Sequence, residues 1–396
     1  MDYPEVVIVG AARTPIGKFQ GAMSTVSAPE LGATAIRAAV ARAGIEPASI
    51  DEVLMGNVVS AGEGQAPARQ AAIGAGLPVT VGASTVNKIC GSGLKTVMLA
   101  AQAIRSGDGE VFVAGGMESM NQIPYYLLNG RFGYRMGNAD LVDGMIHDGL
   151  WCAFEKHHMG NSAEWIAREY GVTRQAQDEF SLESHRRAVA AMDEGRFAAE
   201  ITPVEIAQRK GPALVIDTDE TPRRDTTLEA LARLRPAFEA GGTVTAGNAP
   251  PISDGGAAVV VMNGERARAT GVKPLARVTG YAQAAVKPLE LFTAPIFAVR
   301  RLLERLDVGI DYFDLIEVNE AFASQTIADG RALGMDWAKV NVNGGAIAMG
   351  HPIGCSGSRV LVTLLYALQQ RGLRTGLATL CLGGGEAVAL SVEMLH

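Results

Sequence analysis

Cysteine is scarce in this chain, and its spacing argues against two common kinds of site. The 396 residues include four cysteines, Cys90, Cys152, Cys355 and Cys381. No two of them form a C-x-x-C pair, which disfavours zinc ribbons and thioredoxin-type redox sites. Four cysteines in so long a chain are also too few for the disulfide framework of a small secreted protein. We therefore expect reduced thiols and a cytoplasmic location.

Long apolar runs and an excess of positive charge are also missing. No apolar run reaches the roughly 18 residues of a transmembrane helix, and the N-terminal segment lacks the basic region of a signal peptide. The formal net charge of −7 disfavours binding to nucleic acid or to an anionic membrane. We expect neither as a partner, and an anionic ligand would need local basic groups.

Apolar residues and glycine are abundant. Hydrophobic residues make up 48% of the chain and charged residues only 19%, a composition that excludes a disordered protein. Glycine supplies 47 of the 396 residues, well above the usual ~7%. Since no collagen-like period accompanies it, we expect glycine in tight turns and at close approaches of the backbone.

Short β-branched runs alternate with alanine-rich helical stretches, which predicts an α/β protein. Strands are expected at 6–9 and 50–59, and helices at 29–43, near 65–76 and near 162–196. Pro29 suits the first turn of its helix, and Gly44 suits its end.

An internal repeat divides the chain into two similar halves. The recurring segments are 35–57 with 298–320, 90–104 with 355–368, 111–116 with 378–385, and 255–263 with 385–393. The first copy is interrupted before its last strand. We therefore predict an N-terminal half of residues 1–119 plus 250–273, an inserted domain of 120–249 and a C-terminal half of 274–396. Two such halves commonly share a site at their interface.

Cys90 is the first candidate for chemistry. It stands in Val86-Asn87-Lys88-Ile89-Cys90-Gly91-Ser92-Gly93, where a strand gives way to a helix. The positive end of a helix is expected to lower the pKa of a thiol and favour the nucleophilic thiolate. The following glycines would let a substrate reach the backbone N–H groups. The alternative is a small, buried, inert cysteine.

Three other segments place polar residues beside glycine or at the end of a strand. His351 lies in NVNGGAIAMGHPIGCSGSR (341–359), and either a catalytic or a structural histidine fits that spacing. Cys381 begins CLGGG, whose glycines are typical of a ligand-side loop. Asn319 and Glu320 close an apolar strand in VNEAFA, where Glu320 is either a base or a cap. Cys355 is interpreted as the packing counterpart of Cys90.

The chain offers little for metals or nucleotide cofactors. His157 and His158 are adjacent, so their side chains are expected to point apart, and no ligand spacing supports a metal site. Neither a Rossmann fingerprint nor a Walker A sequence occurs. We expect no metal.

Seven motifs taken together make the chain resemble the thiolase family over nearly its whole length. They are VNKICGSG, HHMG (157–160), TVTAGN (243–248), SDGGAA (253–258), VNEAFA, NVNGGAIAMGHPIGCSGSR and CLGGG. The resemblance implies an α/β fold of five layers, α-β-α-β-α, built from two similar halves with an inserted loop domain. It also implies a ping-pong acyltransferase that condenses two acetyl-CoA molecules, or cleaves 3-ketoacyl-CoA, without a metal or redox cofactor.

The resemblance also implies the catalytic roles. Cys90 would be the acylated nucleophile and His351 its base. Cys381 would move the proton at Cα of the second acetyl-CoA. His351 and a water on Asn319 would hold the enolate oxygen, and the N–H groups of Cys90 and Gly383 would form the other oxyanion hole.

Coenzyme A would be held mainly by the inserted domain. His158 and Met159 would line the pantetheine or acyl end, and Arg223 with Arg224 would meet the nucleotide. The remaining coenzyme A contacts implied are Ala246, Gly247 and Phe322. A homodimer, or a homotetramer built through the 120–150 loop, is the implied assembly.

Two departures from the family pattern bear on the substrate. Pro250 replaces a serine that would touch the pantetheine, so that contact is not expected here. Residues 291–297 are bulky, with Leu291, Phe292 and Phe297 expected to shorten the acyl site. A 3-ketoacyl-CoA thiolase of β-oxidation with a broader chain-length range is the alternative.

Two other enzyme families of this fold, and a non-catalytic binding protein, fit the sequence less well. A β-ketoacyl synthase of this fold would carry Cys-His-His and a 3-hydroxy-3-methylglutaryl-CoA synthase Cys-Glu-His, whereas this chain has Cys381. A non-catalytic binding protein would be expected to have lost Cys90, Asn319, His351 or Cys381, and all four are present.

Overall fold

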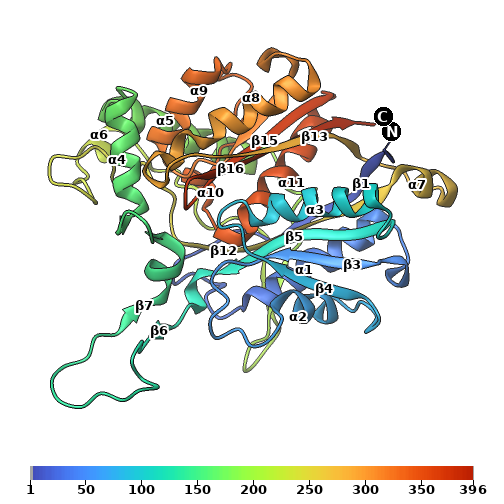
Figure 1. Ribbon diagram of the computed structural model, residues 1–396, viewed down its shortest axis with the longest axis horizontal. Helices are drawn as coiled ribbons and strands as arrows, with labels where there is room; N and C mark the ends of the chain where they lie inside the picture. The colour runs from blue at the N-terminus through green and yellow to red at the C-terminus, as the bar shows by residue number, and fades with distance from the viewer. Residues whose placement is uncertain (1–2, 396) are drawn as a thin grey trace.

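The computed structural model describes residues 3–395, which are built around a mixed sheet of ten strands (Figure 1). From edge to edge the strands run β4-β3-β5-β12-β1-β13-β16-β15-β14, and β2 pairs with β12. In chain order they are β1 Val6–Arg13, β2 Gly17–Lys18, β3 Glu52–Gly56, β4 Gly82–Val86, β5 Val111–Ser119, β12 Ser253–Asn263, β13 Ala276–Ala285, β14 Leu315–Val318, β15 Thr375–Leu382 and β16 Glu386–Met394.

The sheet repeats one topology on either side of the contact between β1 and β13. Outward from β1, the pairs β1–β12 and β12–β5 are antiparallel and β5–β3 is parallel. Outward from β13, the pairs β13–β16 and β16–β15 are antiparallel and β15–β14 is parallel. In the first half, β4 pairs in parallel with the outer edge of β3. At the corresponding edge of β14 in the second half, Ile316 forms a single parallel bridge with Val340.

Helices cover both halves of the sheet and fill the space between them. Helices α3 (Ser92–Ser106) and α11 (Ile353–Arg371) form the middle layer. The outer layers are α1 (Ala28–Ala43) with α2 (Pro67–Gly74) on one side and α8 (Ala294–Leu306) with α9 (Ala323–Leu333) on the other (Figure 1). The predicted five-layered fold from two similar halves is confirmed. The residue boundaries of the domains stay a prediction.

The remaining elements are short strands and helices, most of them in the insertion. The short strand pairs are β6 Tyr125–Tyr126 with β7 Val142–Asp143, β8 Trp151–Cys152 with β9 His157–His158, and β10 Val204–Ile206 with β11 Leu214–Ile216. The further helices are α4 Met159–Glu169, α5 Arg174–Asp193, α6 Leu228–Ala232, α7 Gly264–Thr270 and α10 Ala346–Met349. Figure 1 shows the segment that carries β6 and β7 projecting away from the body of the molecule. In the described part of the chain, no helix combines the length and apolarity needed to cross a membrane.

Local signals explain where some predicted elements begin and end. Helix α1 begins after Ser27, whose side chain and Glu30 form a reciprocal capping box, and ends at Gly44 with a φ of 64°. The helical stretch predicted near 162–196 is divided into two helices. Gly171 takes a φ of 60° and Thr173 caps a new helix, so α4 and α5 are separate.

Strand β3 is shorter than the predicted 50–59. After Gly56, the N–H groups of Val58 and Val59 donate to the buried carboxylate of Glu118 instead of to a neighbouring strand. The chain therefore leaves the sheet at Asn57.

The two middle helices approach each other where only glycine fits. A Cβ added to Gly93 on α3 would lie 2.7 Å from the backbone nitrogen of Ser358 on α11. A Cβ on Gly357 would overlap the backbone of Leu94, and one on Gly116 would overlap the carbonyl of Gly354. These glycines allow the N-terminal ends of α3 and α11 to lie in backbone contact.

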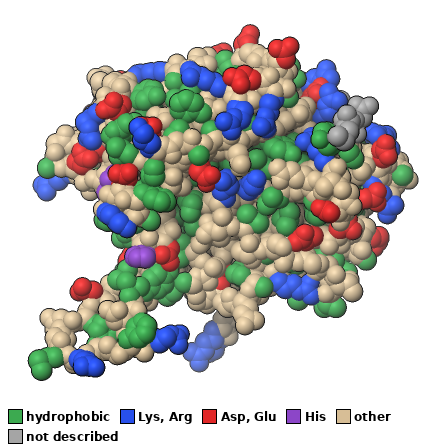
Figure 2. Space-filling model, viewed as in Figure 1, with side chains coloured by type: hydrophobic (Ala, Val, Ile, Leu, Met, Phe, Trp, Pro, Cys, Tyr) green, Lys and Arg blue, Asp and Glu red, His purple; other side chains and the backbone are tan. Residues whose placement is uncertain are grey.

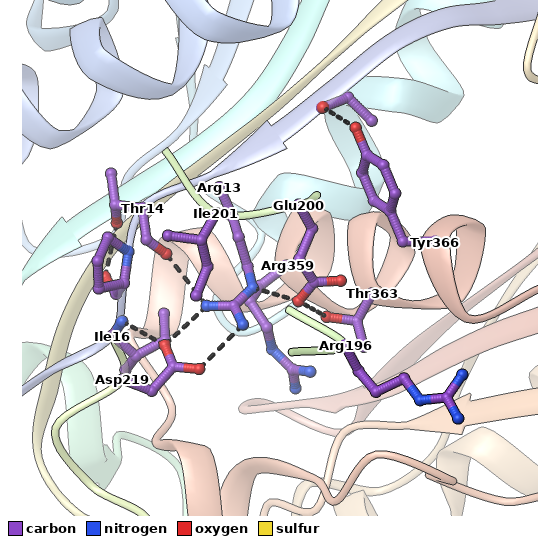
Figure 3. Close-up of polar contacts among 12 residues, drawn as sticks. Arg13, Thr14, Ile16, Arg196, Glu200, Ile201, Asp219, Arg359, Thr363 and Tyr366 are labelled. Atoms are coloured by element: carbon purple, nitrogen blue, oxygen red, sulfur yellow. Dashed lines mark hydrogen bonds and ion pairs between the residues drawn. The ribbon is translucent and has the colours of Figure 1, made fainter. Parts of the chain in front are cut away.

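A buried ion cluster fastens the insertion to the core (Figure 3). Arg13, at the end of β1, donates from Nε to Glu200 at 2.6 Å and from Nη1 to Asp219 at 2.7 Å, and its side chain is fully buried. Asp219 also accepts from the N–H of Ile16 at 2.8 Å, and Glu200 accepts from the Thr363 hydroxyl of α11 at 3.2 Å. The cluster therefore joins β1, α11 and two parts of the insertion.

Replacing Arg13 with Met should destabilise the protein strongly. The change leaves two carboxylates buried without their cation, a loss of about 3–5 kcal/mol in the free energy of unfolding. Chemical denaturation followed by circular dichroism measures it. The matched control is Arg196→Met, which removes an exposed pair with Glu194 and should cost about 0–1 kcal/mol. Equal losses for the two variants would contradict the anchoring role of Arg13.

Candidate active site

One cavity of about 380 Å³ lies where the two halves meet the insertion, and it collects most of the predicted site residues. The predicted residues that line it are Cys90, His158, Met159, Arg223, Ala246, Phe322, His351, Cys381 and Gly383. Asn319 lies directly behind His351. Gly247 belongs to a neighbouring cavity of about 30 Å³, and its N–H donates to Thr245 at 3.1 Å. Gly247 is therefore a predicted contact that does not line the main cavity.

Cys90 is presented by a tight loop between β4 and α3. Ile89, directly before it, has a φ of 47°, a left-handed conformation that is strained for a β-branched residue. The hydroxyl of Ser92 closes the loop by accepting from the N–H of Lys88 at 2.8 Å. A Cβ on Gly91 would lie 2.7 Å from Leu382, so the loop packs tightly against the end of β15. This packing fixes where the thiol points.

The pKa of Cys90 is shifted in the direction opposite to the prediction. Burial raises it to about 12, and the N–H groups of Gly383 and of Cys90 itself only partly oppose that rise. The expected lowering by the helix end is wrong, because the cost of removing a thiolate from water exceeds the gain from the nearby dipoles. The resting thiol is protonated and needs a base.

The hydrogen bonds of His351 favour the tautomer that is protonated at Nδ1 and has a free lone pair at Nε2. The Ser356 hydroxyl donates to the carbonyl of Pro352 at 2.8 Å, so its oxygen accepts from Nδ1–H of His351 at 2.5 Å. Nε2 then carries a lone pair, which accepts from Nδ2 of Asn319 at 3.3 Å. Burial, and next the charge of Arg359, lower the pKa of His351 to about 3. The imidazole is therefore neutral at physiological pH.

Cys381 stands at the carboxyl end of β15, on the wall of the same cavity as Cys90. Burial raises its pKa well above the ordinary value, and the neighbouring Cys90 raises it further. The chain then turns away through Gly384 and Gly385, with φ of 84° and 93°. This turn leaves the N–H of Gly383 beside the sulfur of Cys90.

Aromatic rings close the other side of the cavity. His158 stacks on Phe238 with ring centroids 4.7 Å apart, and Phe322 packs edge-on against both Phe238 and Phe292. Leu291 and Phe292 line the cavity as predicted. The same prediction for Phe297 is wrong, because this side chain is 47% exposed on α8.

The two neighbouring arginines differ in their surroundings. Arg223 lines the cavity, and its backbone N–H donates to Nδ1 of the buried His185 at 3.1 Å. Arg224 instead makes an exposed bidentate ion pair with Asp193, at 2.8 and 2.6 Å. Of the two predicted nucleotide contacts, the structure places only Arg223 at the cavity.

Sequence reasoning missed several residues of the site. Ser356 sets the tautomer of His351, and Phe238 forms the wall against His158. Glu118 accepts from the N–H of Gly354 at the start of α11, at 2.8 Å, and burial raises its pKa to about 7. The spacing of Ser356 from His351, in the first turn of the following helix, is the one local signal available. Within residues 3–395, no three His, Cys, Asp or Glu side chains gather in a way that could hold a metal ion.

Alkylation of Cys90 by iodoacetamide should accelerate with pH without reaching a plateau. Since the thiol has a pKa of about 12, its thiolate fraction rises about tenfold per pH unit between pH 6 and 9. With a pKa of about 3, His351 adds no inflection near 6.5. Mass spectrometry of the Cys90 peptide after timed labelling measures the rate. A plateau near neutral pH would contradict the assigned proton states.

Comparison with known proteins agrees with this geometry. Residues 6–265 match the model of the thiolase N-terminal domain, and residues 272–394 match that of the thiolase C-terminal domain. Acetyl-CoA acetyltransferases of Pseudomonas aeruginosa and Cupriavidus necator are 55% and 54% identical, each over 98% of this chain and 99% of the relative. A crystal structure of the Bacillus anthracis acetyl-CoA acetyltransferase superposes with a TM-score of 0.97 at 42% identity, covering 99% of both chains. The chain belongs to the thiolase family.

Proposed function

We propose that the chain is an acetyl-CoA C-acetyltransferase, which condenses two acetyl-CoA molecules reversibly to acetoacetyl-CoA and coenzyme A. The observation that carries the proposal is the convergence of Cys90, His351 and Cys381 on one cavity, with Asn319 bonded to His351. The names of the relatives, at more than half identity over the whole chain, support the same substrate.

In the first half-reaction, the Cys90 sulfur attacks the carbonyl carbon of acetyl-CoA while its proton passes to Nε2 of His351. The N–H groups of Cys90 and Gly383 face that sulfur, so they can stabilise the oxyanion of the tetrahedral intermediate. The intermediate collapses to acetyl-Cys90, and the departing coenzyme A thiolate takes the proton back from His351. Before the second half-reaction, Cys381 passes its own proton to His351, which leaves a Cys381 thiolate and a protonated His351.

In the second half-reaction, the Cys381 thiolate removes a proton from Cα of another acetyl-CoA. Protonated His351 and a water held by Asn319 stabilise the enolate oxygen. The Oδ1 atom of Asn319 is buried and has no hydrogen-bond partner within residues 3–395, as a site for such a water requires. The enolate carbon attacks acetyl-Cys90, acetoacetyl-CoA leaves, and the Cys90 thiolate recovers its proton from His351. Protein side chains carry every proton, so the proposal includes no metal or redox cofactor.

Coenzyme A is proposed to enter past Arg223, whose guanidinium would meet its phosphates. We also propose a homodimer or a homotetramer in a cytoplasmic setting, with contacts through the projecting segment 120–150. Its exposed apolar side chains include Leu128, Phe132 and Met136, the last two 87% and 100% exposed. Figure 2 shows apolar side chains gathered on this projection. Such a patch is typical of an interface.

Cys381→Ala should separate the two half-reactions. Acetylation of Cys90 needs only a nucleophile, its base and an oxyanion hole, so single-turnover mixing with acetyl-CoA should still label Cys90 alone. Condensation and deuterium exchange at Cα should fall by about 10²–10⁴-fold, the usual contribution of a general base.

The matched control is Cys355→Ala, which changes a buried cysteine without a proposed role and should keep both half-reactions. His351→Ala should impair both. If Cys381→Ala loses acetylation as severely as condensation, Cys381 is not a dedicated base.

Phe292→Ala should lengthen the accepted acyl chain. Phe292 is 2% exposed and lines the cavity, so removing its ring opens space for added methylenes. The ratio of kcat/KM for thiolysis of 3-ketohexanoyl-CoA over acetoacetyl-CoA should rise by at least about tenfold. Phe297→Ala, on the exposed face of α8, serves as the control and should leave the ratio unchanged. An unchanged ratio in Phe292→Ala, or a wild type that prefers eight-carbon chains, would reject the short-chain assignment.

A further inference from the structure

Glu320 follows Asn319 directly, yet it points away from the catalytic cavity into a separate polar cluster. Its side chain is 1% exposed, and both carboxylate oxygens are engaged. Oε2 accepts from the Ser184 hydroxyl at 2.7 Å and from the N–H of Ile347 at 3.1 Å, and Oε1 accepts from Nδ2 of Asn341 at 2.9 Å. The proposed chemistry uses none of these groups.

The three donors to Glu320 come from three segments that lie around Asn319 and His351. Asn341 pins the backbone just before Asn319, because its side chain accepts from the N–H of Val318 at 2.8 Å and donates to the Val318 carbonyl at 2.9 Å. Ile347 lies in α10, which ends one residue before the Gly350–His351 step. Ser184 belongs to α5 of the insertion, and its oxygen also accepts from the N–H of Gly345 at 3.1 Å.

The local backbone is shaped to bring these donors to the carboxylate. Asn341 and Gly344 take φ angles of 45° and 80°, and a Cβ on Gly345 would overlap the Glu320 carboxyl group. Burial raises the pKa of Glu320, whereas the three hydrogen bonds favour its charged form. Charge-assisted hydrogen bonds of this length are about twice as strong as neutral ones, so they fix the segments firmly.

We infer that Glu320 is a positioning residue that holds Asn319 at its working distance from Nε2 of His351. The inference rests on the proposed function, in which Asn319 acts on the enolate oxygen and takes no part in the acetylation of Cys90. Loss of the Glu320 carboxylate should therefore damage the second half-reaction selectively. A misplacement of about 1 Å can reduce a rate by about 10²-fold.

Glu320→Gln provides the test. Glutamine keeps the shape of the side chain, but its NH₂ group replaces one of the two oxygens that accept from Ser184, Asn341 and Ile347. Condensation and deuterium exchange into acetyl-CoA should fall by about 10²-fold. Single-turnover acetylation of Cys90 should change by less than about fivefold, because its base and oxyanion hole do not include Asn319.

The matched control is Glu317→Gln, an identical change at an equally buried carboxylate on β14. Glu317 lies 3.8 Å from Arg359, and burial raises its pKa to about 8, so glutamine resembles its protonated form at neutral pH. Its ratio of condensation to acetylation should match that of the wild type.

A double-mutant cycle distinguishes positioning from general structural damage. In an Asn319→Ala background, Glu320→Gln should have little further effect on condensation, because the group that it positions is gone. Ser184→Ala removes one donor and serves as a milder variant if Glu320→Gln does not fold; it should reduce condensation several-fold and spare acetylation.

Equal losses in both half-reactions, or additive effects with Asn319→Ala, would overturn the role of Glu320. Failure of the wild type to form acetyl-Cys90 would instead overturn the proposed function itself.

Discussion

The backbone contact between α3 and α11 is the constraint on which the site depends. Cys90 lies just before α3 and His351 just before α11, 261 residues later in the chain, and the two helices form the middle layer. Gly93 and Gly357 let their first turns touch, whereas any side chain there would separate them. The carboxylate of Glu118 strengthens this junction by accepting from the N–H of Gly354 and from the chain after β3. Cys90 and His351, the proposed nucleophile and base, come to one cavity because these glycines let the two helices approach.

Burial sets the proton states from which the chemistry starts. It raises the pKa of Cys90 to about 12 and lowers that of His351 to about 3, so the resting pair is neutral. A neutral pair costs little to hold out of bulk water, whereas an ion pair formed before substrate binds would need solvation. In the proposed reaction, the N–H groups of Cys90 and Gly383 act on negative charge only as it develops, which favours the transition state over the ground state.

The insertion completes the site from the outside and is tied to the core both at a buried ion cluster and beside the site itself. Arg13 holds it through Glu200 and Asp219, and Ser184 of α5 reaches the carboxylate of Glu320. The next residue, His185, accepts from the backbone of Arg223 at the cavity. Ser184 and His185, which are adjacent on α5, therefore contact Glu320 beside Asn319 and the proposed coenzyme A residue Arg223, respectively. The buried charges of the Arg13 cluster stabilise this arrangement only while they remain paired.

The sequence by itself determined the features that short segments encode. The repeat predicted two halves, Pro29 and Gly44 predicted the bounds of α1 to within one residue, and the glycine-rich motifs indicated Cys90, His351 and Cys381 as candidate site residues. Only the tertiary structure decided which way the pKa of Cys90 moves, that Arg224 pairs with Asp193, and that Phe297 faces outward. It also decided that Cys355 lies inside the first turn of α11, whereas its counterpart Cys90 precedes α3. The reason is physical: capping and turn formation depend on neighbouring residues, but desolvation and ion pairing depend on groups that arrive from distant parts of the chain.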